Sequence, residues 1–211
     1  YLRKLGKTRH KVIAFDSRRG YADTSASLSL VVDSHKAAQL VGDAPVRDRL
    51  EQLTASIDQG LLALPHEVEG KGFVQYVTVE DDYKRYPHKE NGGYSYTWIM
   101  KYGRKTTAML GILCHARSQQ LPDGDVADKY RELALQAARK YLATEPDMAD
   151  RPWPVELGMV ILLELAAHET TGDSKFLERG RYFAAVARAA YWPDRSPLPK
   201  ADPECDHYEN V

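Results

Sequence analysis

The dipeptide Gly-Asp occurs three times in this chain of 211 residues, and its surroundings limit the folds that the chain can adopt. The copies are Gly42-Asp43, Gly124-Asp125 and Gly172-Asp173. An apolar segment with helical spacing precedes each copy, and another follows it. The chain therefore contains an internal repeat, and a repeat of this kind is typical of proteins built from stacked copies of one structural unit.

The spacing after the turns supports this repeat. Large or small apolar residues follow the first Asp at helical intervals, and residues at the same offsets follow the third. The first set is Leu50, Leu53, Ile57 and Leu61, and the matching set is Gly180, Phe183, Ala187 and Tyr191. The second copy, with Leu133, Ala137 and Tyr141, is displaced by about two residues.

Each Gly-Asp pair has a simple physical explanation. A Gly just past a helix end can adopt the left-handed conformation that closes the helix without a Cβ penalty. The following Asp can accept hydrogen bonds from the first amides of the next helix, where its charge also suits the helix dipole. The pair is thus predicted to end one helix and to begin another, so that three copies make three αα-hairpins.

The predicted hairpins span approximately residues 23–62, 98–142 and 155–192 of one domain that covers 1–211. Asp125 and Asp173 lie 48 residues apart, whereas Asp43 and Asp125 lie 82 apart. The longer interval places an insertion at residues 63–97, in which FVQYVTV alternates as a short strand would. We therefore expect an all-α protein with a small β element in the long 63–97 loop. The segment KVIAF near the N-terminus is a second candidate for extended structure.

Composition excludes several classes of function. Lys and Arg number 29 against 30 Asp and Glu, so a net charge of −1 offers no general attraction for nucleic acid or anionic lipid. No apolar run approaches the roughly 20 residues that span a bilayer. The two cysteines, Cys114 and Cys205, make no disulfide framework. We expect no nucleic acid partner and no membrane.

The third repeat also carries a family resemblance. Residues 158–187, GMVILLELAAHETTGDSKFLERGRYFAAVA, resemble one hairpin of the α/α-toroid superfamily, which includes six-hairpin glycosidases and related polysaccharide lyases. The resemblance rests on a T-G-D turn that follows a G-x-x-x-L-L-x-L run, and it extends over most of residues 23–192. It implies a partial α/α toroid, and it favours a secreted or periplasmic protein.

Complete toroids of this kind close with about six hairpins, and an open arc would leave apolar helix faces uncovered. Since only three hairpins are evident, we expect the chain to be a fragment of a longer toroid. Self-association is the alternative way to cover those faces.

The connections between helices differ at the two ends of the repeat. The Gly-Asp turns are short, whereas the links 63–97, 143–155 and 192–211 are long. Long loops on a rigid scaffold are where binding and catalytic residues concentrate. In the families that the chain resembles, the loop-rich end holds the sugar cleft.

The candidate site residues come from these long links. The segment HKENGGYSYTW (88–98) is the densest polar cluster, and Gly92-Gly93 would allow a tight turn that brings its side chains together. The candidate catalytic residues are His88, Tyr94 and Glu156, and the candidate substrate-binding residues are Asn91, Trp98 and Trp153. The alternative is structural: a solvated turn at 88–98, and a Glu156 that only favours the helix dipole.

These residue types suit two reactions on carbohydrate. Glycoside hydrolysis uses two carboxylic residues, one as acid and the other as base or nucleophile. Polysaccharide lysis needs a base such as Tyr or His, with a polar group that stabilises the developing charge. Both sets are present, so we expect a glycoside hydrolase or a polysaccharide lyase with a carbohydrate substrate. A non-catalytic glycan- or protein-binding module is the alternative, and terpene cyclisation is disfavoured by the polar loops.

No cofactor or metal is expected. The sequence lacks a P-loop, a dinucleotide fingerprint, an H-E-x-x-H motif and a nucleophile elbow. The acidic segment DPECDHYENV (202–211) offers no matching set of metal ligands. His168-Glu169 begins like H-E-x-x-H, but the fourth residue after His168 is Gly172, so HETTGD is predicted to be a structural turn.

Overall fold

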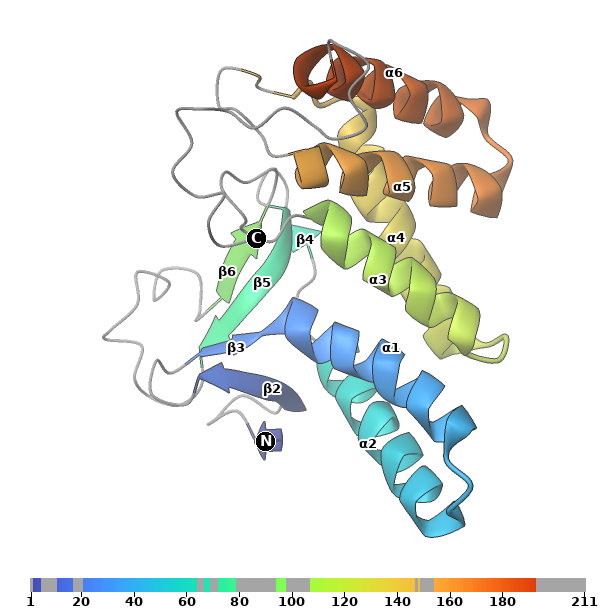
Figure 1. Cartoon of the computed structure of the whole chain (residues 1–211). Coiled ribbons are helices and arrows are strands. Elements are labelled where there is room, and N and C mark those ends of the chain that lie inside the picture. The colour runs from blue at the N-terminus through green and yellow to red at the C-terminus, as the bar shows by residue number, and fades with distance from the viewer. Residues whose placement is uncertain are drawn as a thin grey trace. The chain divides into compact units, whose positions relative to one another are not determined.

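Six helices carry nearly all of the side chains that the structure, a computed structural model, describes. They are α1 (Thr24–Leu40), α2 (Ala44–Leu62), α3 (Thr107–Gln120), α4 (Asp125–Leu142), α5 (Pro154–Thr171) and α6 (Ser174–Tyr191) (Figure 1). Apart from Phe73 and Met148, every described side chain belongs to a helix or to the turn at its end. The prediction of a helical protein is therefore confirmed, whereas closure into a toroid stays a prediction.

The described residues leave several gaps. The backbone is described for residues 2–4, 11–16, 21–63, 67–68, 72–78, 94–97, 107–146, 148 and 154–192. Side chains are described for residues 24–63, 73, 107–146, 148 and 154–192.

Six short strands accompany the helices. They are β1 (Leu2–Lys4), β2 (Lys11–Asp16), β3 (Tyr21–Asp23), β4 (Glu67–Val68), β5 (Gly72–Thr78) and β6 (Tyr94–Thr97). Their order is β1-β2-β3-β5-β4, with β6 also paired to β5, and every pair is antiparallel. Strands β4, β5 and β6 lie in the 63–97 insertion, as predicted for a small β element, and β2 contains the KVIAF segment.

The chain divides into two compact units. The first comprises Tyr1–Thr97 and Leu113–Leu133, and the second comprises Trp98–Ile112 and Ala134–Val211. In the first unit α1 packs against α2, and Val31 and Ile57 are fully buried. In the second unit α5 packs against α6, and Leu163 and Phe183 are fully buried. The predicted single hairpin domain over 1–211 stays a prediction.

The Gly-Asp turns form helix ends as expected, with differences of detail. The Asp43 side chain accepts a hydrogen bond from the Val46 amide and caps α2, and Asp173 accepts one from Lys175 and caps α6. Gly172 has the predicted left-handed conformation, with φ 70°. Its amide donates to the His168 carbonyl at 2.7 Å, which closes α5. The HETTGD turn is therefore structural.

The other two turns use only part of this arrangement. Gly42 lacks a left-handed φ. Helix α4 begins at Asp125 itself, so this Asp lies in the first helical turn, where its charge favours the dipole. Prediction of an Asp at each helix start was correct. Prediction of a left-handed Gly that closes the preceding helix was wrong at Gly42 and also at Gly124, since α3 already ends at Gln120.

An arginine closes the C-terminal end of α4 in the second unit. The Arg179 guanidinium of α6 donates to the Tyr141 carbonyl at 2.7 Å and also to the Thr144 carbonyl. It lies over the rings of Tyr182 and Phe183, at 4.5 and 4.7 Å from their centroids. One side chain therefore satisfies carbonyls that the end of a helix leaves without partners.

None of the described helices is long and apolar enough to cross a membrane.

Candidate functional site

Only one of the six predicted site residues has a described side chain. Glu156 lies in the first turn of α5 and is 3% exposed. Tyr94 begins β6, and its backbone lies opposite Val77 of β5, while its side chain lies outside the described part. The remaining four, His88, Asn91, Trp98 and Trp153, lie outside the described residues. The structure therefore places Glu156 and the Tyr94 backbone, and it leaves the assembly of the six residues a prediction.

Buried polar side chains recur in the first turns of the odd-numbered helices. In α1 these are Thr24, Ser25 and Ser27, in α3 it is Thr107, and in α5 it is Glu156. Helices α3 and α5 follow long connections, and α1 directly follows β3, so none of the three begins at a Gly-Asp turn. Polar groups are seldom buried without a bonding or functional reason. The first turns of α1, α3 and α5 are therefore among the places where the described structure buries polar side chains.

A buried tyrosine lies near Glu156 in the second unit. The Tyr141 hydroxyl accepts a hydrogen bond from the Ala108 amide at 2.9 Å, and the side chain is fully buried. Burial raises the pKa of Tyr141 far above its usual range, and the nearby charges of Glu156 and Glu164 raise it further. Tyr141 therefore keeps its proton, and it holds the first turn of α3 rather than acting as a base.

Glu164, two turns further along α5, is an unusual buried acid. Its side chain is 0% exposed, and neither carboxyl oxygen has a hydrogen-bond partner within the described structure. Burial raises the pKa of Glu164 to about 8, although the positive charge of Arg179 opposes the shift. The carboxyl group is therefore mostly protonated at neutral pH.

The backbone positions of Glu156 and Glu164 are farther apart than the two carboxyl groups of a glycosidase. Eight residues of α-helix separate the two positions by about 12 Å along the axis. The two carboxyl groups of a glycosidase lie roughly 5–9.5 Å apart, on either side of one bond. Glu156 is the member of the pair at the loop-rich end, so it alone stays a candidate for chemistry.

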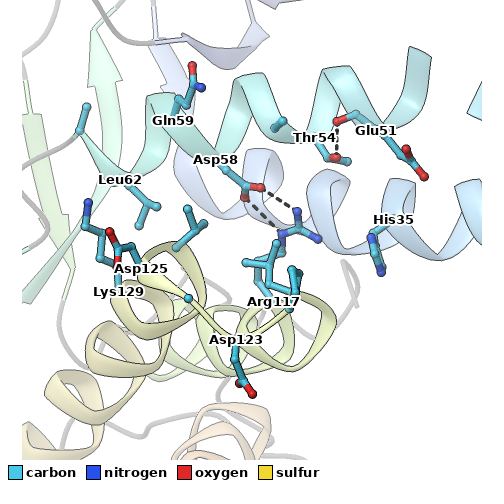
Figure 2. Close-up of a pocket in the computed structure, with 16 residues that line it drawn as sticks. His35, Glu51, Thr54, Asp58, Gln59, Leu62, Arg117, Asp123, Asp125 and Lys129 are labelled. Carbon is cyan, nitrogen blue, oxygen red and sulfur yellow. Dashed lines mark hydrogen bonds and ion pairs between the residues drawn. The ribbon is translucent and has the colours of Figure 1, made fainter. Parts of the chain in front are cut away.

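A pocket of about 1000 Å³ lies in the first unit, between α2 and the α3–α4 turn (Figure 2). Its apolar lining includes Ala55, Leu62, Leu121 and Val126. Its polar lining consists of His35, Glu51, Thr54, Asp58, Gln59, Arg117, Asp123, Asp125 and Lys129. This volume and this mixture of walls are typical of small-molecule sites. The pocket lies beside the Gly124-Asp125 turn and also reaches Leu62 and Ala63, where the 63–97 insertion begins, and sequence reasoning did not identify it.

A buried ion pair forms part of the pocket wall. Arg117 of α3 donates two hydrogen bonds to Asp58 of α2, Nε to Oδ1 at 3.2 Å and Nη2 to Oδ2 at 2.7 Å (Figure 2). The Tyr130 hydroxyl of α4 donates to the same Oδ1 at 2.7 Å, and Arg117 Nη1 donates to Gln120. Burial, with the Asp58 charge, raises the pKa of Tyr130 far above its usual range. The network joins three helices and fixes the geometry of the wall.

His35 lies at one side of the pocket as a neutral imidazole. Burial lowers its pKa from 6.5, and the positive charge of Arg117 lowers it further. The Gln39 amide nitrogen lies 3.0 Å from Nε2, so Gln39 donates to this nitrogen and the ring proton stays on Nδ1. His35 therefore offers one hydrogen-bond donor.

Sequence reasoning missed both the pocket network and the buried Glu164. A partial signal existed, because Asp58 and Arg117 each interrupt an apolar helical segment. Nothing in the spacing paired residues that lie 59 positions apart. No group of three or more potential metal ligands occurs among the described residues, and the 202–211 segment lies outside them.

No protein-family model matches the chain, and searches of curated proteins and of solved structures returned no match.

Proposed function

We propose that the chain is part of an α/α toroid and acts on carbohydrate, as a glycoside hydrolase or a polysaccharide lyase. The observation that carries the proposal is the position of Glu156, a buried carboxyl in the first turn of α5, at the end of the helix that the 143–155 loop enters. The first turns of α1 and α3 also contain buried polar side chains, which supports a polar site at the starts of these helices.

In this proposal Glu156 is the acid or base that transfers a proton to or from the sugar. A carboxyl group serves this role when it lies within hydrogen-bond reach of the reacting oxygen or carbon. His88 and Tyr94 are the other proposed catalytic residues, and Asn91, Trp98 and Trp153 are the proposed substrate-binding residues. The proposal needs no cofactor, since carboxyl, phenol and imidazole groups supply the chemistry of both reactions.

The test is turnover of a polysaccharide panel that includes neutral and acidic polymers. Release of reducing ends reports hydrolysis, and ultraviolet absorbance of unsaturated uronides reports lysis. Replacement of Glu156 by Gln is expected to lower turnover by about a hundredfold or more, because a positioned acid or base contributes at least that factor. Glu169→Gln, at the exposed opposite end of α5, is the matched control and should keep the wild-type rate. Equal rates in the two variants would remove Glu156 from the site.

A non-catalytic binding module is the second proposal. The pocket of the first unit favours it, because that pocket can hold a ligand without any contribution from Glu156. The same panel separates the two proposals: a module binds a polymer and releases no product, whereas an enzyme releases reducing ends or unsaturated sugars.

A further inference from the structure

The pocket between α2 and the α3–α4 turn has the features of a second ligand site. A volume of about 1000 Å³ is large enough for a ligand of one or two sugar rings. Its apolar walls come from two sides, with Ala55 and Leu62 on α2 and with Leu121 and Val126 at the α3–α4 turn. Because Asp58, Arg117 and Tyr130 are bonded to one another, the polar wall is held in place before a ligand binds.

The charges that line the pocket exclude an anionic ligand. The positive charge of Arg117 is balanced by the carboxylate of Asp58, so this pair adds no net charge that would attract a phosphate or carboxylate. Among the remaining lining residues, Glu51, Asp123 and Asp125 outnumber Lys129. The excess negative charge would repel an acidic group, and repulsion of this kind is a common source of specificity.

The hydrogen-bonding groups suit hydroxyl groups rather than a single charged group. His35 offers an N–H donor, Lys129 offers an ammonium, and Glu51 offers carboxylate oxygens that accept. Arg117 uses three of its five N–H groups on Asp58 and Gln120, which leaves two for other acceptors. A hydroxyl both donates and accepts, so a ligand rich in hydroxyls can pair with this mixture, whereas an amine can use only the acceptors.

We propose that this pocket binds an uncharged, hydroxyl-rich ligand, a neutral mono- or disaccharide unit, at a site whose lining does not include Glu156. The choice of a sugar over another polyol rests on the proposed function. The position of the site and its discrimination against acidic ligands depend only on the residues that line the pocket. If the proposal is correct, the chain recognises neutral sugar in this pocket of the first unit as well as acting on sugar through Glu156.

The experiment fills the pocket without removing its polar groups. Ala55 is exposed on α2 and lines the pocket, so Ala55→Trp should occupy it, whereas Ala37→Trp places the same side chain on an exposed position of α1 outside it. Binding is measured by titration calorimetry with cellobiose, xylobiose and mannobiose, and with digalacturonate and chitobiosamine as acidic and basic counter-probes. We expect at least one neutral disaccharide to bind more tightly than both counter-probes, and Ala55→Trp to weaken it at least tenfold while Ala37→Trp leaves it unchanged.

A second variant protects the test against misfolding of the first. Val126 is 41% exposed and lines the opposite wall, and Val46 is 47% exposed on α2 outside the pocket. Val126→Trp should weaken binding as Ala55→Trp does, and Val46→Trp should not. The proposal is overturned if no neutral probe binds, if a charged counter-probe binds most tightly, or if the pocket variants match their controls.

The two proposals fail in different ways. Glu156→Gln should keep disaccharide binding at the pocket. If the chain turns over a polysaccharide and Ala55→Trp binds disaccharide as the wild type does, the proposed pocket site is rejected and the proposed enzyme activity is retained. If Ala55→Trp loses disaccharide binding and the chain turns over no polymer, the proposed enzyme activity is rejected and the proposed pocket site is retained.

Discussion

Two of the three buried acidic side chains that the structure describes, Asp58 and Glu164, are accommodated in opposite ways. Asp58 accepts hydrogen bonds from Arg117 and Tyr130, so its buried carboxylate is surrounded by donors. Glu164 has no such partner, and it is buried with a pKa near 8. A buried carboxyl is tolerated either when it is bonded or when it holds its proton. The difference between these two residues gives the first prediction.

The stability of the chain should depend on pH through Glu164. The folded state holds this proton up to about pH 8, whereas the ordinary value for the residue is 4.5. The folded state therefore binds more protons between these values, and the free energy of unfolding falls as pH rises from about 4.5 to about 8 and levels off above. Glu164→Gln should remove this fall, which we expect to be on the order of 2 kcal/mol. Urea unfolding at a series of pH values measures it.

The charged and titratable groups around Glu164 define the control. Arg179 approaches it from α6, Tyr141 from α4, and Glu156 lies on the same helix. Because these groups stay in place in Glu164→Gln, the difference between the wild-type and variant curves isolates one carboxyl. Glu169→Gln, at the exposed end of α5, should keep the wild-type slope. A Glu164→Gln curve parallel to that of the wild type would contradict the prediction.

At the scale of the helices, the second unit depends on a close contact at Gly111. A Cβ added to Gly111 of α3 would lie 2.7 Å from the Ala137 Cβ of α4 and 2.9 Å from Leu163 Cδ1 of α5. Atoms at these distances overlap. The neighbouring atoms belong to Ala137 and Leu163, whose short or branched side chains lie in a packed core and cannot easily move aside. The absence of a side chain at Gly111 is therefore what lets three helices approach.

Gly111→Ala should destabilise the chain by roughly 1–3 kcal/mol, because an added methyl group forces the packed helices apart. Gly158→Ala is the matched control on α5, where nothing lies within 4 Å of the added Cβ. There Ala should stabilise the helix by about 0.5–1 kcal/mol, since Gly is the poorer helix former. Chemical denaturation of the two variants should thus give shifts of opposite sign. A stabilised Gly111→Ala would show that α3 can move away without cost.

Local features of the fold were predictable from the sequence, and the contacts between distant residues were not. The apolar spacing and the Asp caps act within one or two helical turns, so the six helices and the capping of α2 and α6 follow from nearby residues. The Asp58–Arg117 pair and the Glu164 environment depend on how helices pack, which one sequence does not record. For the same reason Glu156 was found by its place at a helix start, while the pocket of the first unit was missed.

At the scale of the whole molecule, the proposed toroid requires cover for the apolar sides of its helices. Helix α5 is apolar on most sides, and on one of them Val155, Leu162 and Leu165 are 49%, 58% and 40% exposed. Their spacing of seven and three residues places them along a single stripe. Exposed stripes of this kind are typical of surfaces that contact another protein surface. When the chain is studied alone, a second copy of the chain is the partner that can cover this stripe.

The last prediction therefore concerns self-association through α5. Sedimentation velocity over a range of concentrations should show a reversible dimer or larger species of the wild-type chain. Leu162→Lys should weaken this association at least tenfold, because a charge in the middle of the stripe would have to be desolvated on contact. Leu40→Lys is the control, since Leu40 is 87% exposed at the end of α1 and is not part of the stripe. A wild-type chain that stays monomeric, or a Leu40→Lys variant that dissociates as Leu162→Lys does, would argue that the apolar stripe of α5 is not an interface. The proposed ring would then lose the physical reason for a partner on that side.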